Sequence, residues 1–398
     1  MPITKLEDLA DPERNPCLVI KVGSSLLVDE DGVRTVWLNG LVGEISEARR
    51  RGQNVIVVSS GAVALGSRTL GFDKGGRGSL ADAQASAAVG QIALSGLWAQ
   101  LLQNHGLIAA QMLVTLMDLE DRRRYLNVTA TIERLLDAGV VPVINENDSI
   151  TTQELKFGDN DRLAARVAQA SGASSVILLS DIDGLYDRHP KEPGATRLSV
   201  VKGITPEIKA MASTESSSGM GSGGMVSKLQ AAEIAALAGT CLVIGNGQCD
   251  RPVERVMGTA EAEGIGTLFL PRRRRGSRQQ GARKVWLGGR LRTKGKIVID
   301  DGAMNALVNE GASLLAKGVI DVDGRFRRGD PVSIVTSAGV IVANGLSEYD
   351  AKEVQAIRRL HSNQQQAVLG YAPRSAVVHR DLMSIKYVPP VADPAVTA

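Results

Sequence analysis

The segment Gly219-Met-Gly-Ser-Gly-Gly-Met-Val-Ser-Lys228 is rich in glycine and leads directly into a helical pattern. Its glycines leave the backbone free to adopt φ > 0 and to approach a ligand closely. Ser227 and Gln230 have the spacing of a capping box. We therefore predict a helix over 227–238, with Gly239 just beyond its end.

In this interpretation Lys228 lies in the first turn of that helix. A lysine there opposes the helix dipole, and a bound polyphosphate would reverse the unfavourable charge. The stretch is not a Walker A loop, because Met225 stands where that motif has its lysine. Taken alone, it is equally compatible with a flexible Ser/Gly surface loop before an ordinary helix.

The composition is that of an ordinary soluble chain of 398 residues, long enough for two or three domains. No apolar run approaches the ~20 residues of a membrane span. Met1–Pro16 has no signal-peptide hydrophobic region, so we predict a cytoplasmic protein with no membrane association. The three cysteines and four histidines are too scattered for a disulfide framework or a zinc site, and we predict no protein-bound metal.

The positive charge of the chain is concentrated in one segment. Residues 271–284 contain six arginines and one lysine and no acid. Without these seven, the 46 basic residues fall to 39, against 43 acidic ones. We interpret the segment, with its run Arg272–Arg275, as a linker and favour a solvated hinge over a nucleic-acid-binding face.

Short apolar runs alternate with helical patterns through the first 270 residues. The runs lack polar alternation, as is typical of strands buried on both faces, and the order predicts a mostly parallel sheet covered by helices. The predicted strands are Leu18–Val22, Val55–Val58, Val140–Ile144, Val176–Leu179 and Leu242–Ile244, and the predicted helices are about 34–51, 80–105, 120–138, 160–171 and 227–238.

Each predicted strand ends in small, polar or charged residues. These ends are Lys21-Val-Gly-Ser-Ser25, Ser59-Ser-Gly-Ala62, Asn145-Glu-Asn-Asp148, Ser180-Asp181 and Gly245-Asn-Gly247. Ligands bind beyond the carboxyl ends of the strands in such sheets, so five such ends together predict a site. Gly158-Asp-Asn-Asp161 adds an acidic cluster before a helix, where Asp159 or Asn160 could equally be an N-cap.

Beyond the linker, residues 285–345 read as short strands and turns rich in glycine and aspartate, which predicts a small barrel-like β domain. Its predicted strands fall at 285–289, 295–300, 312–319, 330–335 and 339–343, and a last helix lies near 350–361. We divide the chain into an N-terminal tail (1–16), a catalytic domain (17–270), the linker (271–284), the β domain (285–362) and a C-terminal segment and tail (363–398).

These motifs, in this order, resemble the glutamate 5-kinase family. The resemblance covers about residues 17–386 and depends most on Pro142-Val-Ile-Asn-Glu-Asn-Asp148 and Ser222-Gly-Gly-Met-Val-Ser-Lys228. It implies a three-layer αβα amino acid kinase fold with a C-terminal PUA domain. It also implies transfer of phosphate from ATP, with Mg²⁺, to L-glutamate in proline synthesis. Feedback inhibition by proline, a homo-oligomer (dimer or tetramer) and hand-off to glutamyl phosphate reductase are expected on the same basis.

The resemblance assigns roles to particular residues. It implies that Lys21 and Lys228 contact the reacting phosphates and that Asp161 orients both lysines. Lys21 could otherwise be an ordinary interfacial lysine at a strand end. The implied glutamate pocket comprises Ser60, Asn145, Glu146, Asp148 and Asn160, and the implied ATP site comprises Lys21, Gly23, Ser180, Asp181, Ser222, Gly223, Gly224, Met225, Val226, Ser227 and Lys228. Gly61 is expected to let backbone N–H groups reach the phosphates.

Two alternatives share parts of this reading. Another amino acid kinase, acting on aspartate or acetylglutamate, would share the phosphate-binding residues and differ near Asn145–Asp148. An RNA-binding PUA protein would use Arg272–Arg275 for phosphate contacts. We disfavour RNA, because Trp286 and Phe326 are nearly the only aromatic residues of this region available for stacking.

Overall fold

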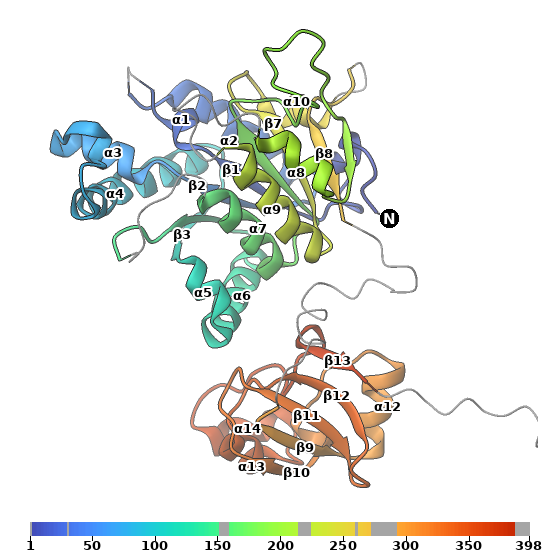
Figure 1. Cartoon of the computed structure of the whole chain (residues 1–398). Coiled ribbons are helices and arrows are strands. Elements are labelled where there is room, and N and C mark those ends of the chain that lie inside the picture. Colours follow the sequence, from blue (N-terminus) through green and yellow to red (C-terminus); the bar gives the residue numbers. More distant parts are fainter. Residues whose placement is uncertain are drawn as a thin grey trace, which may run out of the picture. The chain divides into compact units, whose positions relative to one another are not determined.

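The computed structural model describes residues 2–29, 32–150, 159–213, 224–258, 262–271 and 293–386. The chain forms two compact units, Met1–Ser277 and Arg278–Ala398 (Figure 1). Each unit has its own buried core.

The first unit is built on an eight-stranded sheet with the order β3-β4-β2-β1-β5-β7-β8-β6. Paired strands run parallel, with the exception of the antiparallel pair β7 and β8. The strands are β1 Cys17–Val22, β2 Asn54–Ser59, β3 Ala109–Val114, β4 Val141–Glu146, β5 Ser175–Ser180, β6 Val200–Lys202, β7 Cys241–Asn246 and β8 Thr267–Leu270.

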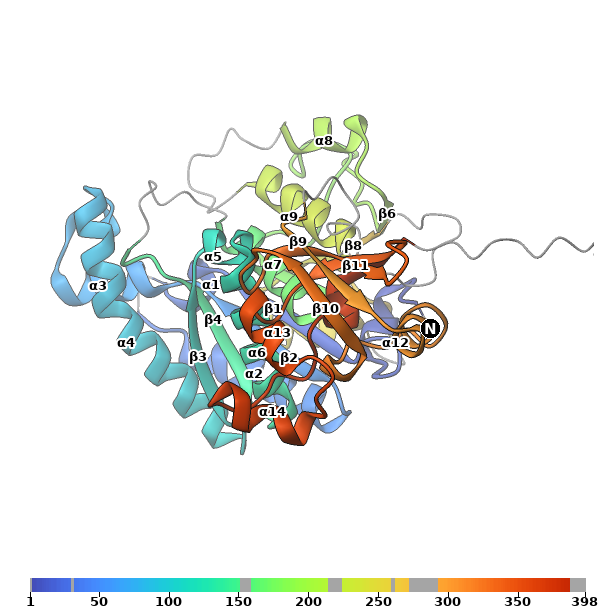
Figure 2. The same ribbon diagram turned by 90° about the horizontal axis from the view of Figure 1, so that it is seen from below.

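Helices cover both faces of this sheet. They are α1 Ser24–Leu27, α2 Thr35–Arg50, α3 Ala62–Leu70, α4 Leu80–Asn104, α5 Leu116–Glu120, α6 Arg122–Asp137, α7 Asp159–Ser171, α8 Pro206–Ser213, α9 Met225–Leu237 and α10 Pro252–Met257, with 3-10 turns η1 Leu6–Ala10 and η2 Asp73–Gly76. Figures 1 and 2 show α3 and α4 side by side at one edge of the unit.

Two hydrophobic cores lie on opposite faces of the sheet, because successive residues of a strand point to opposite sides. In β1, Leu18, Ile20 and Val22 pack with residues of α2, α4 and α10. Cys17 and Val19 pack with residues of α6, α7 and α9. This arrangement confirms the predicted three-layer αβα sandwich with a mostly parallel sheet.

The structure confirms the five strands predicted in this unit and adds strands that the sequence pattern did not reveal. The most important addition is β3 at the sheet edge, where several residues are exposed and Gln111 interrupts the apolar run. Helix α9 begins earlier than predicted: Gly224 is its N-cap and Met225 its first residue, so the capping box at Ser227 is wrong. Gly239, with φ of 73°, follows the helix as expected.

Part of the segment predicted as an N-terminal tail packs on the first unit. Leu6 and Leu9 are buried in the same core as residues of α2 and α10. The Gln53 Nε2 donates hydrogen bonds to the carbonyl oxygens of Leu9 and Asn15 at 2.8 and 2.9 Å. The Asn15 Nδ2 also donates to the Leu9 carbonyl oxygen, at 2.8 Å, so side-chain amides satisfy buried backbone groups of this segment.

Among the described residues, α4 is the one helix long and apolar enough to cross a membrane. Its apolar residues Leu94, Trp98 and Leu102 are buried against the sheet. The Trp98 indole donates a hydrogen bond to Ser59 Oγ at 2.9 Å, inside the core. In this structure α4 therefore packs one apolar face against the core of the first unit.

The second unit contains a five-stranded sheet with the order β10-β9-β11-β12-β13 around one apolar core. Its strands are β9 Gly295–Ile299, β10 Val319–Gly324, β11 Pro331–Thr336, β12 Ile341–Leu346 and β13 Met383–Ile385, and its helices are α12 Asp301–Asn309, α13 Ala351–Ile357 and α14 Ser362–Leu369, with 3-10 turns Ala316–Gly318 and Arg380–Leu382.

Two predictions for this unit need correction. The strand predicted over 312–319 is wrong, because a 3-10 turn occupies Ala316–Gly318 and β10 begins only at Val319. Helix α12 was missed, although Asp300 caps it by accepting a hydrogen bond from the Ala303 N–H at 2.8 Å. The strand predicted at 285–289 and the linker arginines lie outside the described residues.

Candidate active site

Two lysines from distant parts of the sequence converge on one buried carboxylate. Lys21 Nζ lies 2.6 Å from Asp161 Oδ1, and Lys228 Nζ donates a hydrogen bond to Asp161 Oδ2 at 3.3 Å. Asp161 is completely buried, and the two lysines are only 6% and 5% exposed. The three charges therefore interact in a region largely shielded from solvent, where each ion pair is much stronger than at a surface.

The sheet geometry explains how these charges meet. Lys21 is the fifth residue of β1 and aligns with Val58 of β2 and Leu178 of β5. It therefore points to the face covered by α7 and α9, which carry Asp161 and Lys228 respectively. The positions predicted from the sequence as a lysine–aspartate–lysine group are thus brought together.

The pKa of Asp161 reflects a balance of two opposing effects. Burial by itself raises the pKa of a carboxyl, but the charges of Lys21 and Lys228 outweigh burial and leave the pKa below its ordinary value. Asp161 is consequently ionised at neutral pH. One negative charge facing two positive ones leaves an excess positive charge suited to a phosphate.

Two glycines lie at the strand ends around this group. A Cβ added at Gly23 would be 3.7 Å from Lys21 Nζ, in ordinary van der Waals contact, so this glycine lies beside the lysine head. Gly61 precedes α3 with φ of 110°, a conformation that L side chains rarely adopt. Both glycines follow strands of the sheet, β1 and β2, at their carboxyl ends.

The structure describes some of the other residues predicted to bind the nucleotide, but not all of them. Ser180 ends β5, and its hydroxyl donates to Asp181 Oδ1 at 2.9 Å. Met225 is buried, whereas Val226 is exposed at the start of α9, one residue before Ser227. Gly224 is the N-cap of that helix, and Ser222 and Gly223 lie outside the described residues.

A chain of hydrogen bonds begins at Asn160, the neighbour of Asp161 in α7, and leads to β4. Asn160 donates to Ser60 Oγ at 2.6 Å and to Asn145 Oδ1 at 3.4 Å. Asn145 is buried, and its Oδ1 also accepts the backbone N–H of Glu146 at 2.9 Å. Asn160 therefore connects Ser60 and Asn145, two other residues predicted for the glutamate pocket.

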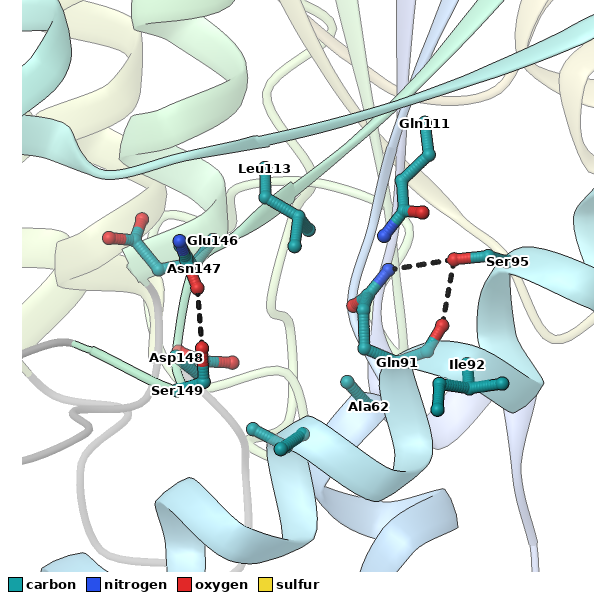
Figure 3. Close-up of a pocket in the computed structure, with 12 residues that line it drawn as sticks. Ala62, Gln91, Ile92, Ser95, Gln111, Leu113, Glu146, Asn147, Asp148 and Ser149 are labelled. Carbon is teal, nitrogen blue, oxygen red and sulfur yellow. Dashed lines mark hydrogen bonds between the residues drawn. The ribbon is translucent and has the colours of Figure 1, made fainter.

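A cavity of about 450 Å³ lies beside these hydrogen-bonded residues, at the sheet edge (Figure 3). Glu146 and Asp148 line it together with amides and small or apolar side chains. The remaining lining residues are Ala62, Ala87, Ala88, Gln91, Ile92, Ser95, Gln111, Leu113, Asn147 and Ser149. Two acids, several amides and a partly apolar wall suit a small zwitterion better than a large apolar ligand.

Sequence reasoning missed Gln91 and Gln111. Gln91 Oε1 accepts a hydrogen bond from Asn145 Nδ2 at 2.8 Å, and Gln91 Nε2 donates to Ser95 Oγ at 3.2 Å. Gln91 lies in the middle of a long helix, and Gln111 lies on the edge strand that was not predicted. Neither residue follows a predicted strand. A search for polar residues at the carboxyl ends of strands therefore could not identify them.

No group of three or more His, Cys, Asp or Glu side chains close enough to hold a metal occurs among the residues that the structure describes. Asp161 lies beside the two lysines and is engaged by both of them. A magnesium ion at this site would therefore depend on the nucleotide phosphates for most of its ligands.

Both units of the chain resemble known protein families. Residues 16–246 match the profile of the amino acid kinase family, and residues 295–369 match that of the PUA domain. A glutamate 5-kinase of Novosphingobium aromaticivorans is 62% identical over 384 residues, covering 96% of this chain and 99% of that one.

Two further relatives are also glutamate 5-kinases. The glutamate 5-kinase of Sphingopyxis alaskensis is 58% identical, covering 94% of this chain and 99% of the relative. The glutamate 5-kinase of Zymomonas mobilis is 52% identical, covering 94% and 92%. With a matching catalytic profile, a PUA domain and this identity over nearly the full length, the chain belongs to the glutamate 5-kinase family of amino acid kinases.

Proposed function

We propose that this chain transfers the γ-phosphoryl group of ATP to the side-chain carboxylate of L-glutamate, giving γ-glutamyl phosphate and ADP, the first step of proline biosynthesis. The observation that carries the proposal is the convergence of Lys21 and Lys228 on Asp161, next to a cavity lined by Glu146 and Asp148. Membership of the glutamate 5-kinase family supports the choice of acceptor.

The reaction suits these residues chemically. A glutamate γ-carboxyl has a pKa of about 4.3, so at neutral pH it is an ionised nucleophile and needs no general base. One carboxylate oxygen forms a bond to the γ-phosphorus, and the bond from that phosphorus to the β,γ-bridging oxygen breaks, so that ADP leaves. The barrier arises from bringing an anion to a polyanion, which positive charge and positioning reduce.

We assign the positive charge to the two lysines. Lys21, beside Gly23 and Gly61, would contact the phosphates between which the bond breaks, and Lys228 would stabilise the transferred group. Asp161 would hold both ammonium groups at the separation that the phosphoryl group requires. Mg²⁺ bound to ATP would supply further neutralisation of the phosphate charge.

The acceptor would occupy the cavity beside β4. Asp148, which is partly buried, and Glu146, which is buried, would attract its α-ammonium group through their negative charge. Ser60, Asn145 and Asn160 would position the side-chain carboxylate toward Lys21 and Lys228. Ser180 and Asp181, with residues 222–228, would contact the nucleotide.

Regulation and assembly are proposed on the family resemblance alone. Proline is expected to inhibit, and as a small zwitterion it has the charges that the acidic cavity suits. We also propose a cytoplasmic homo-oligomer that passes its reactive product to glutamyl phosphate reductase. RNA binding is not part of the proposal.

A substrate panel tests the function. ADP release should depend on L-glutamate, and the acyl phosphate product should be trapped by hydroxylamine as the hydroxamate. Aspartate and acetylglutamate serve as competing acceptors in the same assay. Phosphorylation of either of these, without glutamate phosphorylation, would contradict the proposal and identify a different amino acid kinase.

A further inference from the structure

We propose that the amides of Gln91 and Gln111 form the wall of the cavity that receives the α-carboxylate of the acceptor amino acid. This inference rests on the proposed function and extends it, because it specifies the orientation of the bound substrate in the cavity. The two residues would make the site specific for a free α-carboxylate. They act on substrate recognition and not on the transferred phosphate.

The orientation of the Gln91 amide follows from an unambiguous donor. The backbone N–H of Glu146 donates to Asn145 Oδ1 at 2.9 Å, which identifies the other Asn145 atom as Nδ2. Asn145 Nδ2 lies 2.8 Å from Gln91, so the Gln91 atom at that contact must be the acceptor Oε1. Gln91 Nε2 is consequently a donor.

The position of this donor is fixed within the cavity wall. Gln91 Nε2 donates to Ser95 Oγ at 3.2 Å, and the Ser95 hydroxyl donates to the Gln91 carbonyl at 2.7 Å. An amide nitrogen has two hydrogens, and Ser95 takes one of them. The other is available to a ligand, and Figure 3 shows the Gln111 side chain of β3 directed toward Gln91 of α4.

The charges of the cavity determine which end of the substrate faces this wall. Glu146 and Asp148 would repel a carboxylate and attract an ammonium group. No lysine or arginine is among the residues that line the cavity in the described part of the chain. Arg77 interacts electrostatically with Asp148, so this cation acts at the acidic end of the cavity. The carboxamide groups of Gln91 and Gln111 are the donors for the α-carboxylate at the end away from the acids (Figure 3).

The same hydrogen bonds connect this wall to the reacting group. Gln91 holds Asn145, Asn145 accepts from Asn160, and Asn160 donates to Ser60. Asn160 is followed directly by Asp161, the partner of both lysines. A substrate anchored by its α-carboxylate at one end of this chain would place its side chain toward the other end.

The test compares L-glutamate with its α-carboxamide in wild type, Gln91→Glu and Gln111→Glu. Each substitution keeps the size of the side chain and replaces a donor by a negative charge. At pH 8, kcat/KM for glutamate should fall in both variants, whereas the neutral α-carboxamide should be much less affected. The preference for glutamate over the carboxamide should therefore fall about tenfold or more, the effect of losing one charge-assisted hydrogen bond.

The control is Gln103→Glu, the same substitution at an exposed position of α4. It should leave the preference unchanged, and KM for ATP should stay constant in all variants. An unchanged preference in both Gln91→Glu and Gln111→Glu, or an equal loss with both substrates, would overturn the inference. A wild-type protein that does not phosphorylate glutamate would instead overturn the proposed function.

Discussion

Asp161 is a buried carboxylate balanced by lysines from two different elements. Such a group is expensive to desolvate, and it is retained where its charges perform a task. Its lowered pKa means that it stabilises the fold at neutral pH and that this contribution is lost as the pH falls below the ordinary range of a carboxyl. The residue thus couples the stability of the first unit to the geometry of the proposed phosphate site.

Asp148 permits a separation of acceptor binding from nucleotide binding. It lines the cavity beside Glu146, apart from the lysines that we assign to phosphate. We expect Asp148→Asn to raise KM for glutamate about tenfold or more, because the α-ammonium loses a charged partner. Calorimetric titration with ATP should give nearly the wild-type affinity, and loss of ATP binding would show that Asp148 is misplaced.

Glu44 is a buried acid outside the proposed site. Its Oε1 accepts the Glu254 N–H of α10 at 2.7 Å. Burial raises the pKa of Glu44 from 4.5 to about 7, although backbone hydrogen bonds and Arg251 oppose the shift. Because the pKa is higher in the folded state, the protonated form favours folding, and the free energy of unfolding falls as the pH rises from about 4.5 through about 7.

We expect Glu44→Gln to remove this pH dependence. The variant should match the wild type near pH 4.5 and exceed its unfolding free energy at pH 8 by up to about 3 kcal/mol. Urea unfolding followed by tryptophan fluorescence measures both. Glu47→Gln on the same helix is the control: it breaks a surface ion pair with Arg251 and should change the unfolding free energy by less than about 1 kcal/mol. Equal pH profiles for wild type and Glu44→Gln would refute the assignment.

Which of these residues the sequence reveals depends on their local signals. Lys21, Asn145 and Ser180 could be predicted because each lies at the carboxyl end of a buried strand, where parallel sheets bind ligands. Gln91 could not, because its partner Asn145 is 54 residues away and the helix around it is apolar and glycine-containing. Glu44 reads as an ordinary helix residue, and only the packing of α10 buries it.

At the scale of elements, α3 and α4 approach unusually closely. A Cβ at Gly90 would lie 1.8 Å from the Ala62 carbonyl oxygen, and one at Gly66 would lie 1.8 Å from that of Ser86. Glycine is required here because backbone meets backbone. The contact matters for the site, since Ala62, Ala87 and Gln91 of these two helices line the cavity.

We therefore expect Gly90→Ala to push α3 and α4 apart. The clash with backbone should lower the unfolding free energy by about 1–3 kcal/mol and should raise KM for glutamate by displacing the cavity wall. Gly96→Ala in the same helix is the matched control, because no atom lies within 4 Å of its added Cβ. It should stabilise the protein by about 0.5–1 kcal/mol through helix propensity. If both variants change the unfolding free energy in the same direction, the close contact between α3 and α4 does not require glycine at position 90.

Element prediction succeeded where local pattern and burial agree, as in the five central strands. It failed where long-range contacts decide. Edge strand β3 has a mixed burial pattern, and β8 is short and pairs antiparallel to β7. Helix α9 begins at Met225, which is buried in the core on the α7 and α9 face, so tertiary packing overrides the capping signal at Ser227.

At the scale of the whole molecule, the two units have separate hydrophobic cores. Every described residue that we assign to phosphate or acceptor binding belongs to the first unit, Met1–Ser277. We expect a fragment of residues 1–277 to fold, because its two cores lie entirely within it. It should release ADP in a glutamate-dependent manner, within about tenfold of the full chain.

Circular dichroism of the fragment and the ADP-release assay check this expectation, with the full chain as reference. A fragment that folds but is inactive would show that residues 278–398 take part in the reaction. Comparing proline inhibition in the two proteins would also show whether regulation needs the PUA domain.

The steady-state kinetics of Lys228→Ala with ATP and L-glutamate test whether Lys228 acts on the phosphoryl group during its transfer. If Lys228 stabilises the transferred phosphoryl group, its loss acts on the transition state more than on bound substrates. We predict that kcat falls by about 100-fold or more, while KM for either substrate changes less than about threefold. An unchanged kcat would contradict the account, since the two lysines could not then share the phosphate being transferred.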